Sequence, residues 1–131
     1  MIGIDTNVLV RYIAQDDAVQ SSRATSFIEN ECSVSSLGFV GLVVLAEVVW
    51  VSESCYGATR GEIAEIVRRI LSIKQLVVQD TETAWKALRS FESTKADFAD
   101  CLIGRTANAA GCERMVTFDK QASKGGMVLL K

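Results

Sequence analysis

The sequence predicts an α/β fold in three layers, with a parallel sheet between helices. Short apolar runs of four or five residues alternate along the chain with longer segments whose apolar residues recur at helical spacing. Strands that alternate with helices are joined by crossover connections, so they run parallel and the helices cover both faces of the sheet. No repeat, low-complexity tract or linker interrupts the 131 residues. We therefore expect residues 1–131 to form a single domain.

Five short segments are expected to be the strands of this sheet. Each is an apolar run that ends at turn residues or at a charged or polar residue. The expected strands are MIGI (1–4), CSVS (32–35), LVVQ (76–79), RMVTF (114–118) and MVLL (127–130).

The segments between these strands have the spacing of helices. Helices are expected over 7–14, 17–30, 81–93 and 96–111, from Thr59 through Leu71, from Ser35 or Ser36 to about 53, and briefly through Ser123. Thr59 and Glu62 have the spacing of a capping box. The helix from Ser36 has a competing prediction, a strand, because it is rich in β-branched residues, although 15 residues is long for one strand. Gly38 and Gly41 make the start of this helix uncertain. Each glycine lowers helix propensity by about 1 kcal/mol relative to alanine.

The composition excludes several kinds of site. The chain has no histidine, which excludes Ser-His-Asp and Cys-His catalysis and zinc sites that contain histidine. Its net charge is −2, so overall charge cannot hold a nucleic acid, and any such contact must be local or assisted by metal ions. Acid–base or metal chemistry therefore depends on carboxylates.

The chain has the features of a cytoplasmic protein without membrane segments. It shows no signal peptide, and its longest apolar run, 37–51, is shorter than the roughly 20 residues that span a membrane. The cysteines lie among apolar or small residues and form no C-x-x-C pair, so we expect buried, reduced thiols. They are Cys32, Cys55, Cys101 and Cys112.

Several aspartates occur where a parallel sheet binds ligands. Asp5 ends the first predicted strand and Asp119 follows the fourth, and open parallel sheets bind ligands at the carboxyl ends of their strands. Asp97 and Asp100 are three residues apart on one predicted helix, so they share a face. The neighbours of Asp100 are apolar, which argues against a role in solvent alone.

Glu47 is the one carboxylate in the apolar run 37–51. Burying an unpaired carboxylate is costly, so Glu47 is expected to have a partner. A divalent cation shared with other acids would offset their mutual repulsion, and oxygen-only ligands favour Mg²⁺ or Mn²⁺. One difficulty is that a helix beginning at Ser36 places Glu47 roughly 16 Å along its axis, away from the strand end at Asp5.

Each acid also has a purely structural interpretation. Asp5 precedes Thr6 and Asn7, which favour turns and caps. Asp97 and Asp119 are each placed to cap a following helix. These interpretations stay open for any single acid, and the metal-site hypothesis depends on the acids occurring together.

Four segments carry a resemblance to a known family: MIGIDTNVLVRYI, LAEVVWV, YGATRGEI and DFADCLIGRTANAAGCERMVTFD. In this order and spacing they resemble the PIN-domain ribonucleases, in particular the VapC-type toxins of bacterial toxin–antitoxin pairs. The resemblance covers essentially the whole chain. It implies a single PIN domain over 1–131, with a three-layer PIN-like fold in which helices flank a central parallel sheet of about five strands.

The resemblance also implies roles for the acids. The catalytic, metal-binding acids of the family fall on Asp5, Glu47, Asp100 and Asp119. Asp97 matches an outer acid of close relatives. Thr6 and Thr117 match hydroxyl residues that can position a water molecule at the metal.

A function and partners follow from the same resemblance. It implies a Mg²⁺- or Mn²⁺-dependent endoribonuclease that hydrolyses RNA phosphodiester bonds and acts as the toxin of a toxin–antitoxin pair. It implies an antitoxin protein as partner, with Tyr12, Phe39 and Trp50 as candidate contacts, and a homodimer. Basic residues near the acids are candidate contacts to the RNA backbone, each with surface charge as its alternative: Arg11, Arg105, Lys120 and Lys124.

Two non-catalytic functions remain as alternatives. A receiver-like regulatory module also gathers acids at strand ends. It requires an acidic pair after the first strand, whereas Asp5 is followed by Thr6 and Asn7. The second alternative is an inactive PIN-fold protein that only binds a partner, and the presence of all four acids argues against it.

Overall fold

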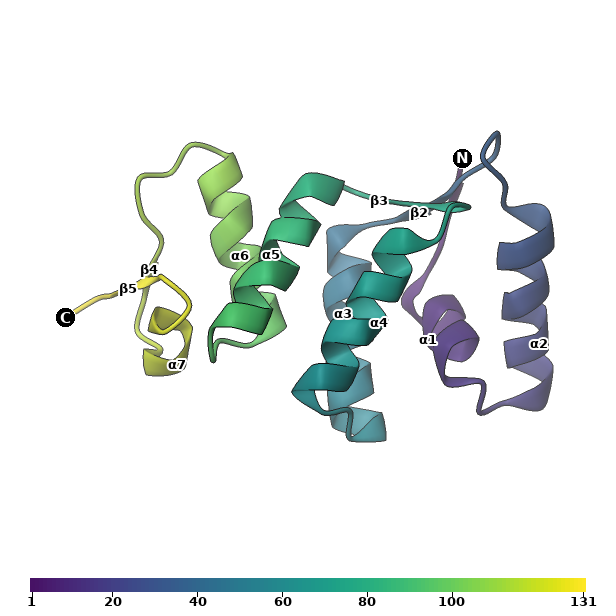
Figure 1. The fold of residues 1–131 in the computed structure, drawn as a ribbon, viewed down its shortest axis with the longest axis horizontal. Coiled ribbons are helices and arrows are strands. Elements are labelled where there is room, and N and C mark those ends of the chain that lie inside the picture. The colour runs from purple at the N-terminus through teal and green to yellow at the C-terminus, as the bar shows by residue number, and fades with distance from the viewer. The chain divides into compact units, whose positions relative to one another are not determined.

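The strands of this protein pair in parallel, as expected for an α/β fold. The computed structural model describes residues 1–131 and divides into two compact parts, Met1–Gln79 (unit 1) and Asp80–Lys131 (unit 2) (Figure 1). Five strands and seven α-helices are present, and each paired strand runs parallel to its neighbour.

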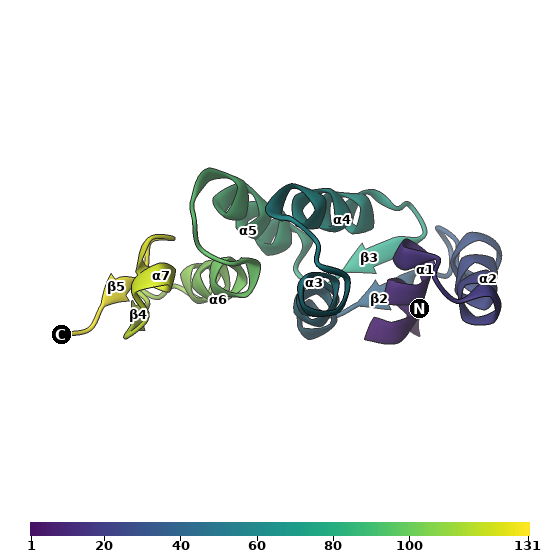
Figure 2. The same cartoon turned by 90° about the horizontal axis from the view of Figure 1, so that it is seen from below.

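Unit 1 contains a three-stranded sheet in the order β1–β2–β3. Its strands are β1 (Ile2–Gly3), β2 (Gly38–Val40) and β3 (Leu76–Val78). Its helices are α1 (Thr6–Ala14), α2 (Ala18–Ser26), α3 (Leu42–Tyr56) and α4 (Arg60–Ser72), and a π-helical turn, η1 (Phe27–Glu31), continues α2. Figures 1 and 2 both show α2 alongside α1.

The helices of unit 1 bury one apolar face each. Leu9 of α1, Val40 of β2, Leu45 and Val48 of α3, and Val67 of α4 are completely buried. Burying a side chain of this size stabilises the fold by roughly 1.5–3 kcal/mol relative to leaving it exposed. These buried side chains hold α1 against α3 and α3 against α4.

The second strand is not where the sequence predicts it. Residues 32–35 form only a turn closed by a bridge between Ser33 and Ser36, and the strand is β2, six residues later. Gly38 explains this placement, because a Cβ there would lie 2.5 Å from Cδ1 of Ile4 and 2.8 Å from Cδ2 of Leu76. Any larger residue at this position would require the side chains of Ile4 and Leu76 to move. The helix predicted from Ser36 consequently begins at Leu42.

Unit 2 is built on a pair of packed helices and a short two-stranded sheet. Its elements are α5 (Thr81–Ser93), α6 (Phe98–Ala109), β4 (Val116–Thr117), α7 (Lys120–Ser123) and β5 (Val128–Leu129). Phe91 and Phe98 meet edge to face between α5 and α6, with ring centroids 6.0 Å apart. The parallel pairing of Val116 with Val128 brings the two strands together.

The predicted fold class is confirmed, with differences in detail. The protein is α/β with parallel strands, in sheets of three strands in unit 1 and two in unit 2. The other predicted helices and strands are present with shifted ends, and residues 27–31 are π-helical. The single domain over 1–131 stays a prediction.

The prediction for the cysteines is half wrong. Cys32 and Cys101 are buried, but Cys55 and Cys112 are exposed because they lie near the ends of α3 and α6. All four are free thiols. Burial raises the pKa of the Cys32 thiol, and the charge of Glu31 raises it further.

No helix of this protein has both the length and the apolar character of a membrane-spanning segment.

Candidate active site

In unit 1, Asp5 and Glu47 are both hydrogen-bonded to the same residue, Thr6. Asp5 follows β1 and caps α1, and its Oδ1 accepts a hydrogen bond of 2.8 Å from the backbone N–H of Thr6. The hydroxyl of Thr6 donates a 2.8 Å hydrogen bond to Oε1 of Glu47 on α3. Two acids that are 42 positions apart in the sequence are therefore both bonded to one threonine.

The position of Glu47 differs from the expectation in two ways. Its side chain is exposed rather than buried in the apolar run, and it shares the exposed face of α3 with Val43 and Trp50. Because α3 begins at Leu42, Glu47 lies only roughly 8 Å from the start of the helix. The shorter helix removes the difficulty of a glutamate too far from the strand ends.

Unit 2 contains three of the acids singled out in the sequence, Asp97, Asp100 and Asp119. Asp97 caps α6 and accepts a 2.8 Å hydrogen bond from the backbone N–H of Asp100. Asp119 caps α7 through Gln121, and its own N–H donates to the hydroxyl of Thr117 at 3.0 Å. The helix-capping alternatives for Asp97 and Asp119 are thus correct as descriptions of local structure.

The carboxyl of Asp100 is the perturbed member of this group. Partial burial raises its pKa above the ordinary value, and the negative charge of Asp97, the hydrogen bond to it, and the charge of Asp119 raise it further. A carboxylate whose neighbours are also negative is stabilised by a nearby cation. Asp100 and Asp119 therefore form an electronegative group in unit 2 without a basic partner in an ion pair.

The donor set fits a hard divalent cation, although neither unit assembles a complete ligand set. Within a unit, no three or more histidine, cysteine, aspartate or glutamate side chains are arranged to hold a metal ion. The candidate donors are all carboxylate oxygens, which suit Mg²⁺ or Mn²⁺. Unit 1 offers Asp5 and Glu47, and unit 2 offers Asp100 and Asp119, with Asp97 beside them.

The predicted basic contacts fall into two groups. Arg11 is engaged within unit 1, because its guanidinium donates to Gln20 at 2.8 Å, to Asp16 at 3.1 Å and to the hydroxyl of Tyr56 at 3.4 Å. Arg105, Lys120 and Lys124 are exposed on unit 2. Contact of these four residues with RNA stays a prediction.

A residue that the sequence did not indicate is Arg114. It lines a hollow in unit 2 together with Asp100 and Arg105, and it forms no ion pair or hydrogen bond in the protein. It lies at the start of a predicted strand, where its charge resembled an ordinary strand boundary. Only the return of the chain after α6 brings it near that helix.

Comparison with known proteins gives a consistent result over nearly the whole chain. A model of the PIN domain family matches residues 2–126. The chain is 26% identical over 124 residues to a VapC ribonuclease of Aquifex aeolicus (strain VF5), a match that covers 94% of this chain and 90% of the relative. No solved structure matches.

Proposed function

The chain belongs to the PIN domain family, and from this premise we propose that it is a metal-dependent endoribonuclease that acts as the toxin of a toxin–antitoxin pair. The relative from Aquifex aeolicus is a ribonuclease, and the match spans nearly the full length of both proteins. The observation that carries the proposal is that Asp5 and Glu47 are both hydrogen-bonded to Thr6 in unit 1. In unit 2, the charges of Asp97 and Asp119 both raise the pKa of Asp100.

The proposed metal ligands are the four acids that the family resemblance implies. Asp5, Glu47, Asp100 and Asp119 would together hold Mg²⁺ or Mn²⁺. When bound, the cation supplies a lowered pKa for a water molecule and offsets the charge that develops on the leaving oxygen. Hydrolysis of an RNA phosphodiester bond then needs no histidine as base.

The remaining residues position the acids. Thr6 holds Glu47 through its hydroxyl, and Asp97 is bonded to the backbone of Asp100, which fixes the first turn of α6. Thr117 accepts the N–H of Asp119 and so fixes the turn after β4. Fixed carboxylates lose little conformational freedom when a ligand binds, which favours a defined ligand arrangement.

The exposed face of α3 is the proposed contact for an antitoxin. Val43 and Trp50 are 75% and 66% exposed, and they flank Glu47 along the helix. A partner that covers these apolar side chains would also cover Glu47 and so inhibit the enzyme. Tyr12 is buried against Arg69 and is therefore not proposed as a contact, and Phe39 is half-buried.

The same proposal includes a homodimer in the cytoplasm.

The test is cleavage of total RNA by the purified protein with Mg²⁺, with Mn²⁺ and with EDTA. We expect cleavage with either ion, none with EDTA, and a loss of at least about a hundredfold in Asp5→Asn, since removal of one metal-held charge disrupts a transition-state interaction. Glu65→Gln is the matched control, because Glu65 is an exposed acid of unit 1 that is not one of the four proposed ligands. Intact activity in Asp5→Asn contradicts the site.

RNA binding and labelling by acetyl phosphate, measured beside cleavage, address the alternatives. RNA that is bound but never cut with either ion would favour a non-catalytic PIN-fold binding protein. Covalent labelling by acetyl phosphate without RNA cleavage would favour a receiver-like module.

A further inference from the structure

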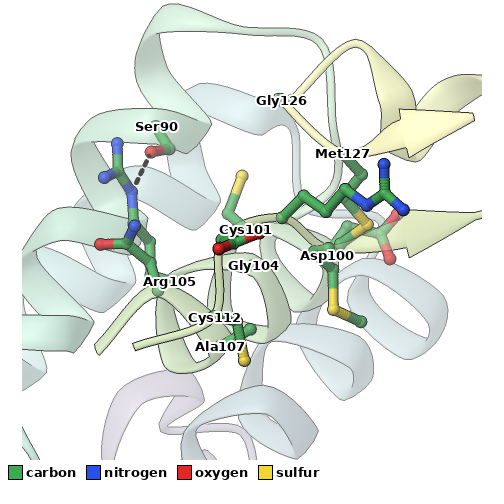
Figure 3. Close-up of a pocket in the computed structure, with 14 residues that line it drawn as sticks. Ser90, Asp100, Cys101, Gly104, Arg105, Ala107, Cys112, Gly126 and Met127 are labelled. Atoms are coloured by element: carbon green, nitrogen blue, oxygen red, sulfur yellow. Dashed lines mark hydrogen bonds between the residues drawn. The ribbon is translucent and has the colours of Figure 1, made fainter. Parts of the chain in front are cut away.

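Unit 2 contains a hollow of about 250 Å³ along one face of α6 (Figure 3). The α6 residues that line it include Asp100, Gly104, Arg105 and Asn108, which recur at the spacing of a single helical face. Figure 3 shows Arg105 on one side of the hollow and Asp100 with Met127 on the other. Asp100, an acid of the proposed site, and Arg105 are roughly 7.5 Å apart along the helix axis.

Arg105 is oriented before any ligand binds. Its Nε donates a 2.9 Å hydrogen bond to the hydroxyl of Ser90, a buried residue of α5 (Figure 3). This bond fixes the plane of the guanidinium and leaves both terminal nitrogens without a hydrogen-bond partner in the protein. A fixed guanidinium with two free N–H groups suits bidentate contact with a phosphate.

Two further polar groups at the hollow have no partner in the protein. The guanidinium of Arg114 and the side-chain amide of Asn108 make no hydrogen bond, and both residues are exposed. Unit 2 carries eight lysines and arginines against seven aspartates and glutamates, a net charge of +1, in a chain whose total is −2. The hollow itself is lined by two acids, Asp100 and Glu113, and two arginines, Arg105 and Arg114, so contact with a phosphate depends on the two guanidinium groups and not on the charge of the unit.

Part of the lining of the hollow is apolar. Met127 and Cys101 are buried beneath it, and Gly104 contributes no side chain. A Cβ at Gly104 would lie 3.9 Å from Cε of Met127, so a longer side chain would extend into this space. A flat aromatic ring can lie on such a lining while its edge reaches a polar group at the rim.

We propose that this hollow binds the nucleotide next to the bond that is cleaved, with Asn108 contacting the edge of its base and Arg105 and Arg114 contacting its phosphate. Sequence-specific RNA recognition depends on unstacked bases that enter such sites and bond along their edges. Phosphate contacts position the RNA, whereas base contacts select the sequence. The inference rests on the proposed ribonuclease function and names the residues that give it sequence preference.

The first experiment maps cleavage in an RNA of randomised sequence by sequencing the cut ends. We expect the wild-type protein to favour one base at one position beside the cut. Asn108→Ala should reduce that preference by about tenfold, and Asn108→Asp should change the favoured base, because a carboxylate accepts but does not donate. Arg114→Ala should lower kcat/KM by about tenfold for all sequences and leave the preference unchanged.

Arg89→Ala is the matched control for this experiment. Arg89 is an exposed arginine on α5 of the same unit and does not line the hollow. Its loss should alter neither rate nor preference. A wild-type enzyme without base preference at the neighbouring positions, or an unchanged preference in both Asn108 variants, overturns the inference while leaving the ribonuclease function intact.

A second experiment separates failure of the inference from failure of the proposed function. Binding of fluorescein-labelled oligouridylate, oligoadenylate, oligocytidylate and oligoguanylate is measured in an Asp5→Asn background with Mg²⁺. We expect affinities that differ between the four probes and converge when Asn108→Ala is added. If the wild-type protein cleaves no RNA, the ribonuclease proposal is wrong, and this binding result still decides the role of the hollow. Four equal affinities before the Asn108 change contradict it.

Discussion

Thr6 is hydrogen-bonded to both of the site acids of unit 1, Asp5 and Glu47. It is 8% exposed, and its hydroxyl holds Glu47 while its backbone N–H is bonded to Asp5. No sequence pattern identifies such a contact, because it joins positions that come together only after α1 packs on α3. The resemblance marked Thr6 as a hydroxyl residue near the metal, and its bond to Glu47 emerges only in the fold.

Replacement of Thr6 by valine tests this contact. Thr6→Val keeps the shape of the side chain but removes the hydroxyl, so we expect a loss of about 1 kcal/mol in the free energy of unfolding and a fall in RNA cleavage. Thr6→Ser keeps the hydroxyl and should retain most of both. Urea unfolding and RNA cleavage measure the two effects, and equal behaviour of the valine and serine variants would argue against the role of the hydroxyl.

The stability of the α1–α3 region should depend on pH through Asp16. The hydroxyl of Tyr56 donates a 2.6 Å hydrogen bond to this carboxylate, and this bond, followed by that from Arg11, lowers the pKa of Asp16 below its ordinary value of 3.8. A carboxylate with a lowered folded-state pKa contributes stability above its unfolded pKa and loses it as the pH falls through the folded value. The contribution is therefore present at neutral pH and disappears below pH 3.8.

Tyr56→Phe tests the pH dependence. The variant lacks the hydroxyl whose hydrogen bond lowers the pKa of Asp16 most, so it should be less stable than the wild type at pH 7 and approach it in stability at low pH. Thermal unfolding measured from pH 7 to pH 2.5 gives both curves. A difference between the two proteins that stays constant across this range would exclude the carboxylate of Asp16 as the source.

At the scale of elements, the fold was predictable wherever a local signal agreed with packing. The capping box at Thr59 and Glu62 is present in full, and α4 begins where it predicts. The error at β2 arose because Gly38 has no local signature for a strand; its need for glycine comes from Ile4 and Leu76, which are distant in the sequence. Exposure of Glu47 was missed for a related reason, because α3 is apolar on both its buried and its exposed faces.

The cap of α4 gives a prediction at this scale. Oγ1 of Thr59 accepts the N–H of Glu62 at 3.2 Å, and the Glu62 carboxylate accepts the N–H of Thr59 at 3.0 Å. Thr59→Ala should therefore lower the free energy of unfolding by about 1 kcal/mol, and Thr59→Ser should lower it far less. Chemical denaturation measures both changes. RNA cleavage should be unchanged under conditions in which each variant is folded.

At the scale of the whole molecule, the proposed metal site depends on acids from both units. The sequence indicates these four acids as candidates, through the predicted strand ends, the apolar settings and the family resemblance, and their role as metal ligands stays a prediction. Their ligand geometry depends on how distant segments of the chain meet, and local sequence patterns carry no information on that. The proposed site is therefore tested by measuring whether the cation stabilises the folded protein as a whole.

Stabilisation by Mg²⁺ tests this response. A ligand that binds only the folded protein raises its stability by about 2.7 kcal/mol at a concentration one hundred times its Kd, so Tm should rise by several degrees. Asp5→Asn in unit 1 and Asp119→Asn in unit 2 should each remove most of the rise, and Glu65→Gln should keep it. Differential scanning fluorimetry with and without Mg²⁺ measures these shifts. A full rise in either aspartate variant would mean that its unit does not contribute to the cation site.

The distribution of thiols has a practical consequence. The two exposed cysteines, Cys55 and Cys112, fall one in each unit, while Cys32 and Cys101 are shielded. Maleimide dyes should therefore attach to the native chain at one point in each half without any engineering. Energy transfer between a donor and an acceptor placed on these sulfurs would report the separation of Cys55 and Cys112 in solution as magnesium or an antitoxin is added.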